Sequence, residues 1–205
     1  YVQDEIADEY WDYLNEALQE YTIGDPNLPK VDIGPIINKN SKDRLLKHIS
    51  ALKKSAKRTI EHHHKQDKDN LFITPIVFEI DSINQIDEEN FGPILHFIRY
   101  KNENLQQVID EINDTGYGLT MGVHSRIVSK ARRIFEAANV GNFYFNRDIV
   151  GAVVGVQPFG GQGLSGTGPK AGGPGYLYNF VTEKTYTDNV MATGGNIELL
   201  NKNAM

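Results

Sequence analysis

The sequence predicts an α/β fold, in which helices flank an open parallel sheet and a β-strand tail follows at the C-terminus. Stretches rich in β-branched and aromatic residues alternate along the chain with stretches whose apolar residues recur at helical spacing. Over residues 93–146 the expected order is strand, helix, strand, helix, strand. Crossovers of this kind are right-handed and join parallel strands of one sheet.

Two helices are expected at the start of the chain. Residues 4–21 carry apolar side chains at helical spacing, and the loop TIGDPNLPK should end this helix. A second amphipathic helix should follow the sequence GPIIN, because Asn40 or Ser41 can cap its first turn. The apolar face of this second helix would consist of Leu45, Ile49, Leu52 and Ala56.

A polar loop and two strands come next. Residues 72–80 and 93–100 are rich in β-branched and aromatic residues and are expected to be strands. Pro75 has no amide hydrogen, so it would place the first strand near a sheet edge or at a bulge. The loop EHHHKQDKDN at 61–70 contains three consecutive histidines. Adjacent residues do not converge on one ion without further ligands, so we expect no metal site there.

The second half of the chain alternates more regularly. Helices are expected at 105–112 and 127–138, and strands at 119–125 and 140–146. The last of these strands leads into a glycine-rich loop. Ligands of open parallel sheets bind beyond the carboxyl ends of the strands, which is where that loop begins. Residues 179–190, NFVTEKTYTDNV, alternate and are rich in β-branched residues, so they predict the tail strand.

Length and composition restrict the class of protein. A chain of 205 residues fits one domain and can bury a core. The net charge of −6 gives no electrostatic reason to expect nucleic acid or an anionic membrane as a partner. The sequence has no apolar run long enough for a transmembrane helix, and its start lacks the pattern of a signal peptide. It has no cysteine, which excludes disulfides and thiolate zinc sites and suits a cytoplasmic location.

The stretch from Gly151 to Gly175 is unusually rich in glycine. Ten of its 25 residues are glycine, while the whole chain has 19. Such density indicates tight turns, or backbone pressed against a ligand. Interleaved apolar residues and three prolines favour an ordered loop over a flexible linker, although a loop that simply packs on its own domain stays possible. The residues expected to anchor this loop are Val150, Val153, Val154, Val156, Phe159 and Leu164.

Two short motifs in this stretch are rejected. Gly161, Gly163 and Gly166 match G-x-G-x-x-G, but the following TGPKAGGPG cannot form the helix that a dinucleotide fingerprint requires. Ser165 stands in GLSGT, which lacks the final glycine of a G-x-S-x-G nucleophile elbow. We expect this serine to be a turn residue that bonds its own backbone.

Four long motifs carry a resemblance to a known family. They are D-E-E-N-F-G-P-I-L (87–95), G-Y-G-L-T-M-G-V-H-S-R (116–126), V-G-N-F-Y-F-N-R (140–147) and Q-P-F-G-G-Q-G-L-S-G-T-G-P-K-A-G-G-P (157–174). Over nearly its entire length the chain resembles the C-terminal half of an aldehyde dehydrogenase. Within that superfamily it is similar to L-glutamate γ-semialdehyde (1-pyrroline-5-carboxylate) dehydrogenases, including the corresponding module of bacterial bifunctional proline utilisation A proteins.

The resemblance implies a reaction and a division of the chain. In that family a cysteine thiolate attacks the aldehyde, hydride leaves to NAD⁺, and a glutamate-activated water hydrolyses the thioester. The cysteine, that glutamate and the cofactor-binding domain all precede the matching segment, and this chain has no cysteine. A serine without a positioned base cannot replace a thiolate. We therefore expect a catalytic-domain segment (1–178) without catalytic residues of its own, inactive alone, followed by an oligomerisation strand and tail (179–205).

The resemblance also implies two cofactor-binding residues. Glu89, in the motif E-N-F-G-P, would bind the nicotinamide ribose hydroxyls of NAD, since a carboxylate can accept two hydroxyl donors. Phe91 would pack beside the nicotinamide ring. From the residues alone, Glu89 is equally a solvated charge in an acidic turn, and Phe91 equally a core aromatic.

Three further positions are implied for the substrate. Gly151 and Ala152 would bind the α-carboxylate of the aldehyde through backbone amides, which small residues let an anion approach closely. Phe159 would wall the aliphatic chain of the aldehyde, or else serve only to anchor the loop. Arg147, just before the loop, could add attraction for a carboxylate, although an arginine at a strand end is usually solvated.

Three functions stay open at this point. The chain could be the C-terminal segment of a glutamate-semialdehyde dehydrogenase of proline catabolism, a non-catalytic assembly or lid module, or part of a dehydrogenase for another aldehyde, which the loop GAVVG disfavours. The expected partners are a small-molecule substrate, the remainder of the dehydrogenase chain and further protomers. The tail strand would join protomers, with an ordinary edge strand as the alternative. No nucleic-acid or membrane contact is expected through this segment.

Overall fold

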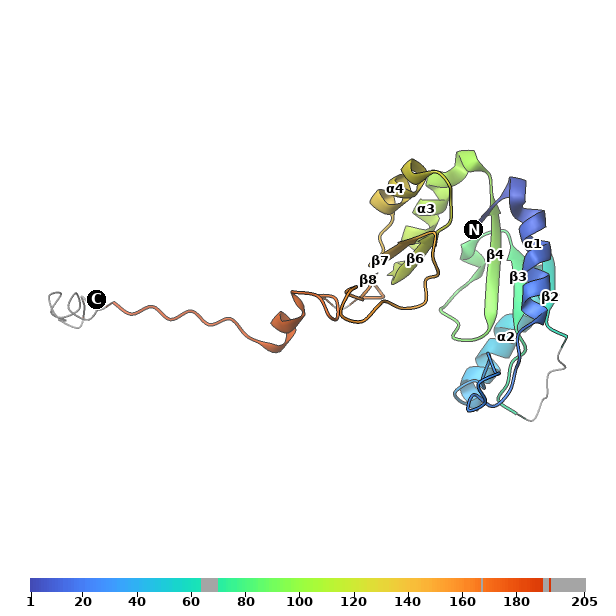
Figure 1. Cartoon of the computed structure of the whole chain (residues 1–205), viewed down its shortest axis with the longest axis horizontal. Helices are drawn as coiled ribbons and strands as arrows, with labels where there is room; N and C mark the ends of the chain where they lie inside the picture. The colour runs from blue at the N-terminus through green and yellow to red at the C-terminus, as the bar shows by residue number, and fades with distance from the viewer. Residues whose placement is uncertain (64–69, 167, 190–191, 193–205) are drawn as a thin grey trace.

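The computed structural model describes residues 1–63, 70–166, 168–189 and 192. A four-stranded sheet with helices α1 and α2 lies beside a smaller unit of β6, β7, α3 and α4, and the chain then extends away from both (Figure 1). The predicted α/β class is confirmed. The elements are β1 (Val2–Gln3), α1 (Asp4–Gln19), α2 (Lys39–Ser55), β2 (Arg58–Glu61), β3 (Ile76–Ile80), η1 (Ile83–Gln85), β4 (Ile94–Tyr100), η2 (Asn102–Asn104), α3 (Leu105–Asp114), β5 (Tyr117–Gly118), β6 (Thr120–Val123), α4 (Val128–Ala137), β7 (Asn142–Phe145), β8 (Gln162–Gly163) and η3 (Tyr176–Phe180).

The main sheet has the strand order β1-β4-β3-β2. β1 and β3 both run parallel to β4, while β2 runs antiparallel to β3. The prediction that Pro75 would push its strand to an edge is wrong, because β3 lies in the interior of the sheet between β4 and β2. The proline precedes Ile76, the first residue of β3, so its missing N–H falls outside the ladder.

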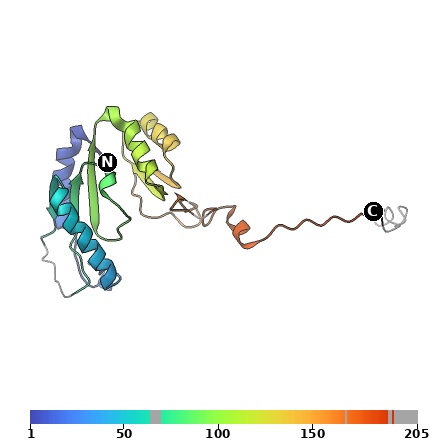
Figure 2. The same ribbon diagram turned by 180° about the vertical axis from the view of Figure 1, so that it is seen from behind.

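Two helices cover the two faces of this sheet, as Figures 1 and 2 show from opposite sides. All five residues of β3 are buried, as is usual for a strand covered on both faces. Their side chains alternate, since Ile76, Phe78 and Ile80 belong to the cluster under α2. Val77 packs with Ala7, Trp11 and Leu18 of α1. The core is therefore a three-layer arrangement of helix, sheet and helix.

The first two helices form close to where the sequence predicts them. α1 covers most of the predicted range 4–21. α2 is capped by Asn38, whose side-chain oxygen accepts a hydrogen bond from the Ser41 N–H at 2.9 Å. The predicted cap at Asn40 or Ser41 is therefore wrong. The reason is that a capping side chain reaches the amide two or three residues ahead, which places Ser41 inside the first turn.

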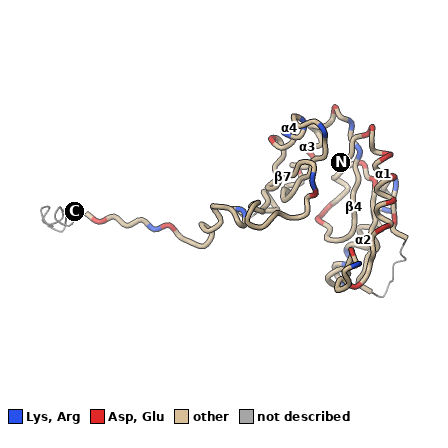
Figure 3. Tube along the Cα trace, in the orientation of Figure 1, with Lys and Arg blue, Asp and Glu red and all other residues tan. Residues whose placement is uncertain are grey.

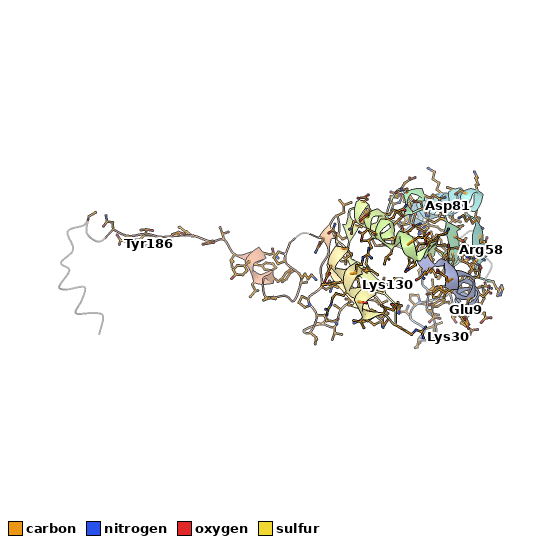
Figure 4. The ribbon with its side chains drawn as sticks, turned by 90° about the horizontal axis from the view of Figure 1, so that it is seen from above. Glu9, Lys30, Arg58, Asp81, Lys130 and Tyr186 are labelled. Atoms are coloured by element: carbon orange, nitrogen blue, oxygen red, sulfur yellow. The ribbon has the colours of Figure 1, made fainter. Side chains whose placement is uncertain are left out.

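A buried carboxylate ties the strands of the main sheet together. Glu79 of β3 is 4% exposed and lies 2.5 Å from Arg58 of β2 and 2.7 Å from Arg99 of β4. Asp8 of α1 also contacts both arginines, and Arg58 lies over the ring of Trp11 at 4.5 Å. Figure 3 shows acidic positions along α1, and Figure 4 labels Glu9 of α1 and Arg58 of β2. Removing Glu79 would leave both arginines without their buried carboxylate partner, so the network links β2, β3 and β4.

The smaller unit is a parallel pair of strands with two helices. β6 pairs with β7, and α3 and α4 pack on them through Leu105, Ile109 and Ile134. The single parallel sheet expected over 93–146 is not formed, because the hydrogen bonds divide β4 from the β6–β7 pair. β4 pairs with β3 along most of its length and with β1 at Arg99 and Tyr100.

The predicted tail strand has no pairing partner within the described residues of this chain. The chain forms η3 at Tyr176–Phe180 and then extends without strand pairing through residues 181–189, away from the folded part (Figure 1). Tyr186, labelled in Figure 4, is 83% exposed. The β-branched sequence favours an extended backbone, but a strand also needs a neighbour to take its hydrogen bonds, and no described segment supplies one.

Part of the histidine-containing loop at 61–70 lies outside the described residues. Glu61 closes β2, and residues 64–69 are not described. In the described ranges no three histidine, aspartate or glutamate side chains form a group that could hold a metal ion. Nor does any helix within those ranges have the length and apolar character needed to cross a bilayer.

Candidate functional site

The glycine-rich loop follows β7 and begins where the carboxyl ends of β6 and β7 are hydrogen-bonded to each other. Asn146 follows β7 with a φ of 54°, a left-handed conformation that asparagine tolerates better than most residues. Its side chain accepts a hydrogen bond from the Ser125 N–H and donates one to the Ser125 carbonyl, both at 2.9 Å. Its own N–H donates to the Val123 carbonyl at 2.9 Å. The carboxyl ends of the two strands are thus held together where the loop starts.

A buried asparagine of β7 holds the later part of the loop, at Pro158 and Gly160, by hydrogen bonds. Asn142 of β7 is 8% exposed and donates to the Pro158 carbonyl at 3.0 Å, while its side-chain oxygen accepts from the Gly160 N–H at 3.2 Å. A Cβ at Gly141 would lie 1.8 Å from the Gly160 carbonyl oxygen, so this close approach requires glycine. The Lys170 ammonium group donates to the Gly141 carbonyl. Pro158, Gly160 and Lys170 are therefore fixed to the strand pair.

Between these two attachments, residues 147–157 project from the strand ends. The N–H of Val150 donates to Asp148 at 3.0 Å, and that of Val153 donates to the Gln157 side chain at 3.1 Å. Between these two bonds, the amides of Gly151 and Ala152 donate to no other group in the described part of the chain. Two consecutive small residues thus offer free N–H groups, which is the arrangement that an anion-binding backbone requires.

A buried tyrosine of β7 holds the Gly151–Ala152 peptide by a hydrogen bond. Tyr144 of β7 is 5% exposed, and its hydroxyl donates to the Gly151 carbonyl at 2.9 Å. Arg147 lies over the Tyr144 ring at 4.5 Å and reaches the Gln157 side-chain oxygen at 3.5 Å. The expectation that Arg147 is simply solvated is therefore wrong, because its guanidinium is held inside the loop by the ring and by polar partners.

The valines of this loop do not anchor it, contrary to the sequence prediction. Val150 is 83%, Val154 95% and Val156 74% exposed. Leu164 is also exposed, and only Phe159 is half-buried, where its backbone pairs with Ala171. The asparagines and tyrosine described above fix the loop instead. The composition did not indicate that polar side chains would make these contacts.

The two predicted cofactor residues lie in a different loop, before β4. Phe91 is 77% exposed, and the carboxylate of Glu89 makes no hydrogen bond or ion pair to the other described residues. The alternative of a core position for Phe91 is thereby excluded within this chain. A free carboxylate and a free aromatic ring two residues apart suit a ribose diol beside a planar ring, so these residues fit a nicotinamide nucleotide.

A pair of histidines lies next to this loop. His48 of α2 and His96 of β4 approach each other with 2.9 Å between their Nε2 atoms and 5.1 Å between ring centroids. Burial lowers the pKa of His96 to about 4, with the neighbouring His48 adding to the effect. Burial also lowers the pKa of His48, although Asp87 and Glu88 act against it. Both rings are therefore neutral at pH 7, and one Nε2–H donates to the other Nε2.

The two rejected motifs have structural roles instead. No helix opens at Gly166 in the described residues, since the next helical element is η3 at Tyr176–Phe180, so the helix that a dinucleotide fingerprint requires is absent there. The Ser165 hydroxyl accepts a hydrogen bond from the Gly118 N–H of β5 at 3.1 Å. The expectation that Ser165 bonds its own backbone is therefore wrong, because the β5–β8 pairing brings an unused amide of another strand within its reach.

The structure brings Gly151 and Ala152 together on one loop, with Phe159 farther along the same segment. It places Glu89 and Phe91 on another loop, and no hydrogen bond or ion pair between described residues joins the two groups. In the view of Figure 1 the loop before β4 extends toward the loop after β7.

Sequence reasoning missed Tyr144, Gln157 and Asn142. The signal for Asn142 was available, since an amide side chain at the start of an apolar strand, VGNFYF, needs a specific hydrogen-bonding partner.

Comparison with known proteins agrees with the motif resemblance. Residues 1–186 match the model of the aldehyde dehydrogenase family. The bifunctional protein PutA of Klebsiella aerogenes is 42% identical over 189 residues, which cover 89% of this chain and 14% of that protein. A 1-pyrroline-5-carboxylate dehydrogenase of Geobacillus kaustophilus is 34% identical over 189 residues, which cover 91% of this chain and 36% of that protein.

A solved structure also matches the fold. The crystal structure of a variant of proline utilization A (PutA) from Bradyrhizobium japonicum superposes with a TM-score of 0.84 at 48% identity, and the match covers 94% of this chain and 20% of that one. The chain thus spans a small part of the length of PutA and about a third of the shorter relative. The family match extends over most of the 205 residues, and on this ground the chain belongs to the aldehyde dehydrogenase family.

Proposed function

We propose that this chain is the C-terminal part of the catalytic domain of an NAD-dependent L-glutamate γ-semialdehyde dehydrogenase, which oxidises the semialdehyde to glutamate in proline catabolism. Residues 1–178 would form the catalytic-domain segment. Since the chain contains no cysteine, the nucleophile would come from the remainder of the dehydrogenase polypeptide. The exposed valines of the loop are apolar surface that this remainder would cover.

The observation that supports this proposal most is the pair of free amides at Gly151 and Ala152. The loop uses the amides on either side of them, at Val150 and Val153, for its own hydrogen bonds. A substrate carboxylate would accept from the two that remain, and such charge-assisted bonds are about twice as strong as neutral ones. With its carboxylate held in this way, the semialdehyde would present its aldehyde group in a fixed direction, and Phe159 would lie beside its aliphatic chain.

The cofactor role falls to Glu89 and Phe91. The Glu89 carboxylate would accept hydrogen bonds from the two ribose hydroxyls of NAD, and the exposed Phe91 ring would pack beside the nicotinamide. When bound, NAD accepts the hydride that leaves the substrate carbon. The contribution of these two side chains is to orient the nicotinamide ribose and ring.

The tail from residue 179 has a separate proposed role in joining protomers. Residues 181–189 expose Val181, Tyr186 and unpaired backbone groups, which can pair with a strand of another protomer. In the full-length enzyme, removal of the chain after residue 178 should lower the oligomeric state measured by light scattering. An unchanged oligomer would show that the tail does not join protomers.

The test of the proposed function compares two aldehydes in the full-length enzyme. Ala152→Val should lower kcat/KM for glutamate γ-semialdehyde about tenfold to a hundredfold, because a branched side chain crowds the anion and loses about 1.5–3 kcal/mol of charged hydrogen bonding. Propanal, which has no carboxylate, should lose little. NADH formation is followed at saturating NAD⁺.

Val150→Leu is the matched control, since it adds bulk to an exposed residue of the same loop whose amide is already bonded to Asp148. It should leave both aldehydes unaffected. Equal losses for both aldehydes with Ala152→Val, or a wild-type enzyme that does not prefer glutamate γ-semialdehyde, would contradict the proposed carboxylate anchor.

A further inference from the structure

The orientation of the Ala152 amide is controlled by the carbonyl of the preceding residue. The Gly151 carbonyl and the Ala152 N–H belong to one planar trans peptide group, so they point in opposite directions. The Tyr144 hydroxyl donates to that carbonyl at 2.9 Å from beneath the loop. Because Tyr144 is buried, this bond turns the Ala152 N–H away from the strands and toward the outer side of the loop.

Such control is needed because the preceding residue is a glycine. Gly151 has a φ of 65°, and no atom lies within 4 Å of the place where its Cβ would be. A glycine in open space can populate both signs of φ, so the peptide that follows it can rotate at little cost. A hydrogen bond to the carbonyl selects one orientation and also polarises the peptide, which strengthens its N–H as a donor.

The other side of the peptide is fixed by Gln157. Its side-chain oxygen accepts from the Val153 N–H at 3.1 Å, and its own N–H donates to the Val153 carbonyl at 2.9 Å. Arg147 connects the two supports, because its guanidinium lies over the Tyr144 ring and reaches the Gln157 oxygen at 3.5 Å. Residues 151 and 152 are therefore held from both ends by side chains that leave their amides free.

We propose that Tyr144 and Gln157 are positioning residues that give the site its selectivity for aldehydes bearing a carboxylate, by holding the Gly151–Ala152 peptide with its N–H outward. This inference rests on the proposed function, since it concerns the same carboxylate anchor. Neither residue touches the substrate. Their effect is on how well two backbone amides are aligned before the carboxylate arrives, which reduces the ordering cost of binding.

The test uses Tyr144→Phe and Gln157→Met in the full-length enzyme. Each variant keeps most of the side-chain volume. Tyr144→Phe removes the hydrogen bond to the Gly151 carbonyl, and Gln157→Met removes the bonds from the Val153 N–H and from Arg147. The substrates are glutamate γ-semialdehyde and 4-aminobutanal, which is the same molecule without the α-carboxylate. With Tyr144→Phe we expect KM for the semialdehyde to rise about tenfold, with kcat within about twofold and 4-aminobutanal unaffected. Gln157→Met should give the same pattern with a rise of about threefold.

Binding without turnover supplies a second readout. L-glutamate, which carries the α-carboxylate, is titrated into each variant by calorimetry, and its Kd should rise by the same factors while that of NAD⁺ stays constant. Tyr1→Phe is the matched control, because it removes a tyrosine hydroxyl bond to Glu111 at 3.1 Å away from the loop. It should change neither KM nor Kd. If Tyr144→Phe does not fold, the same measurements on Gln157→Met test the proposal.

Two failures can be told apart. If the wild-type enzyme prefers glutamate γ-semialdehyde over 4-aminobutanal but both variants keep that preference, the positioning role is overturned and the anchor stands. Equal losses on both aldehydes likewise overturn it, since they indicate a structural role. If the wild-type enzyme shows no preference at all, the proposed function itself has failed.

Discussion

The histidine pair between α2 and β4 predicts a specific dependence of stability on pH. Burial lowers the pKa of His96 to about 4, and lowers that of His48, so both rings are neutral when the protein is folded at pH 7. In the unfolded chain a histidine has a pKa of about 6.5. As the pH falls through 6.5, the unfolded state therefore takes up protons that the folded state does not. The stability that the neutral pair provides is complete above pH 6.5 and is lost progressively down to about pH 4.

The magnitude follows from the same values. For His96 alone, the difference between pKa values of 6.5 and about 4 would lower the free energy of unfolding by about 2 kcal/mol between pH 7.5 and pH 5. The ring is only half-buried, so solvent screening reduces this to ~1 kcal/mol. There is also a geometric reason for the loss, because two rings whose Nε2 atoms lie 2.9 Å apart share one proton, and a second proton places two N–H groups against each other.

The assay is urea unfolding of the 205-residue protein at pH 7.5 and pH 5, followed by the fluorescence of Trp11, its one tryptophan, which packs on the same sheet. His96→Gln should lose about 1 kcal/mol less than the wild type between the two pH values. His124→Gln, at an exposed position in the smaller unit, should behave as the wild type does. The reasoning is refuted if wild type and His96→Gln lose the same stability over this range.

Three further predictions concern catalysis and packing. The 205-residue chain alone should form no NADH from glutamate γ-semialdehyde, because it has no cysteine, and turnover above the buffer blank would contradict this. In the full-length enzyme, Glu89→Ala should weaken productive NAD⁺ binding about tenfold to a hundredfold, with the adjacent Glu88→Ala as its control; unchanged NAD⁺ kinetics would show Glu89 to be a surface carboxylate. Gly141→Ala should destabilise by about 1–3 kcal/mol in urea unfolding, because its Cβ meets the Gly160 carbonyl, whereas Gly34→Ala, with 3.5 Å of space, should not; equal stability of the two variants would contradict the close approach.

Sequence periodicity predicted the helices well because each of them has a single partner surface. α1 and α2 each bury one stripe against the sheet, so the spacing of apolar residues was sufficient. The strand order was not available in the same way, because β1 is only two residues long and yet occupies the flank of β4. A pairing of that length leaves no pattern in the sequence from which its place beside β4 could be predicted.

For the candidate site residues, the sequence indicated their location in loops but not the side chains that hold those loops. Motif resemblance located Gly151, Ala152 and Glu89 on exposed loops, where the structure has them. It could not supply Tyr144, because a tyrosine in the strand sequence NFYF is equally an ordinary core aromatic. Its role depends on a carbonyl seven residues later, and that contact exists only once the loop has folded back over β7.

Glycine has two different roles in the glycine-rich stretch, close packing and conformational freedom, and the composition does not distinguish them. At Pro158, Gly160 and Lys170 the stretch is held to β7 and to the residue before it by Asn142 and Lys170, and there glycine serves close packing. From Asp148 to Gln157 the backbone is held by a few side-chain bonds, its valines are exposed, and glycine serves conformational freedom. A binding loop needs both parts, because amides can meet an anion only if they are free of internal partners, and they can be selective only if their direction is fixed from elsewhere. The fixed part of the stretch therefore makes the free amides of the other part useful.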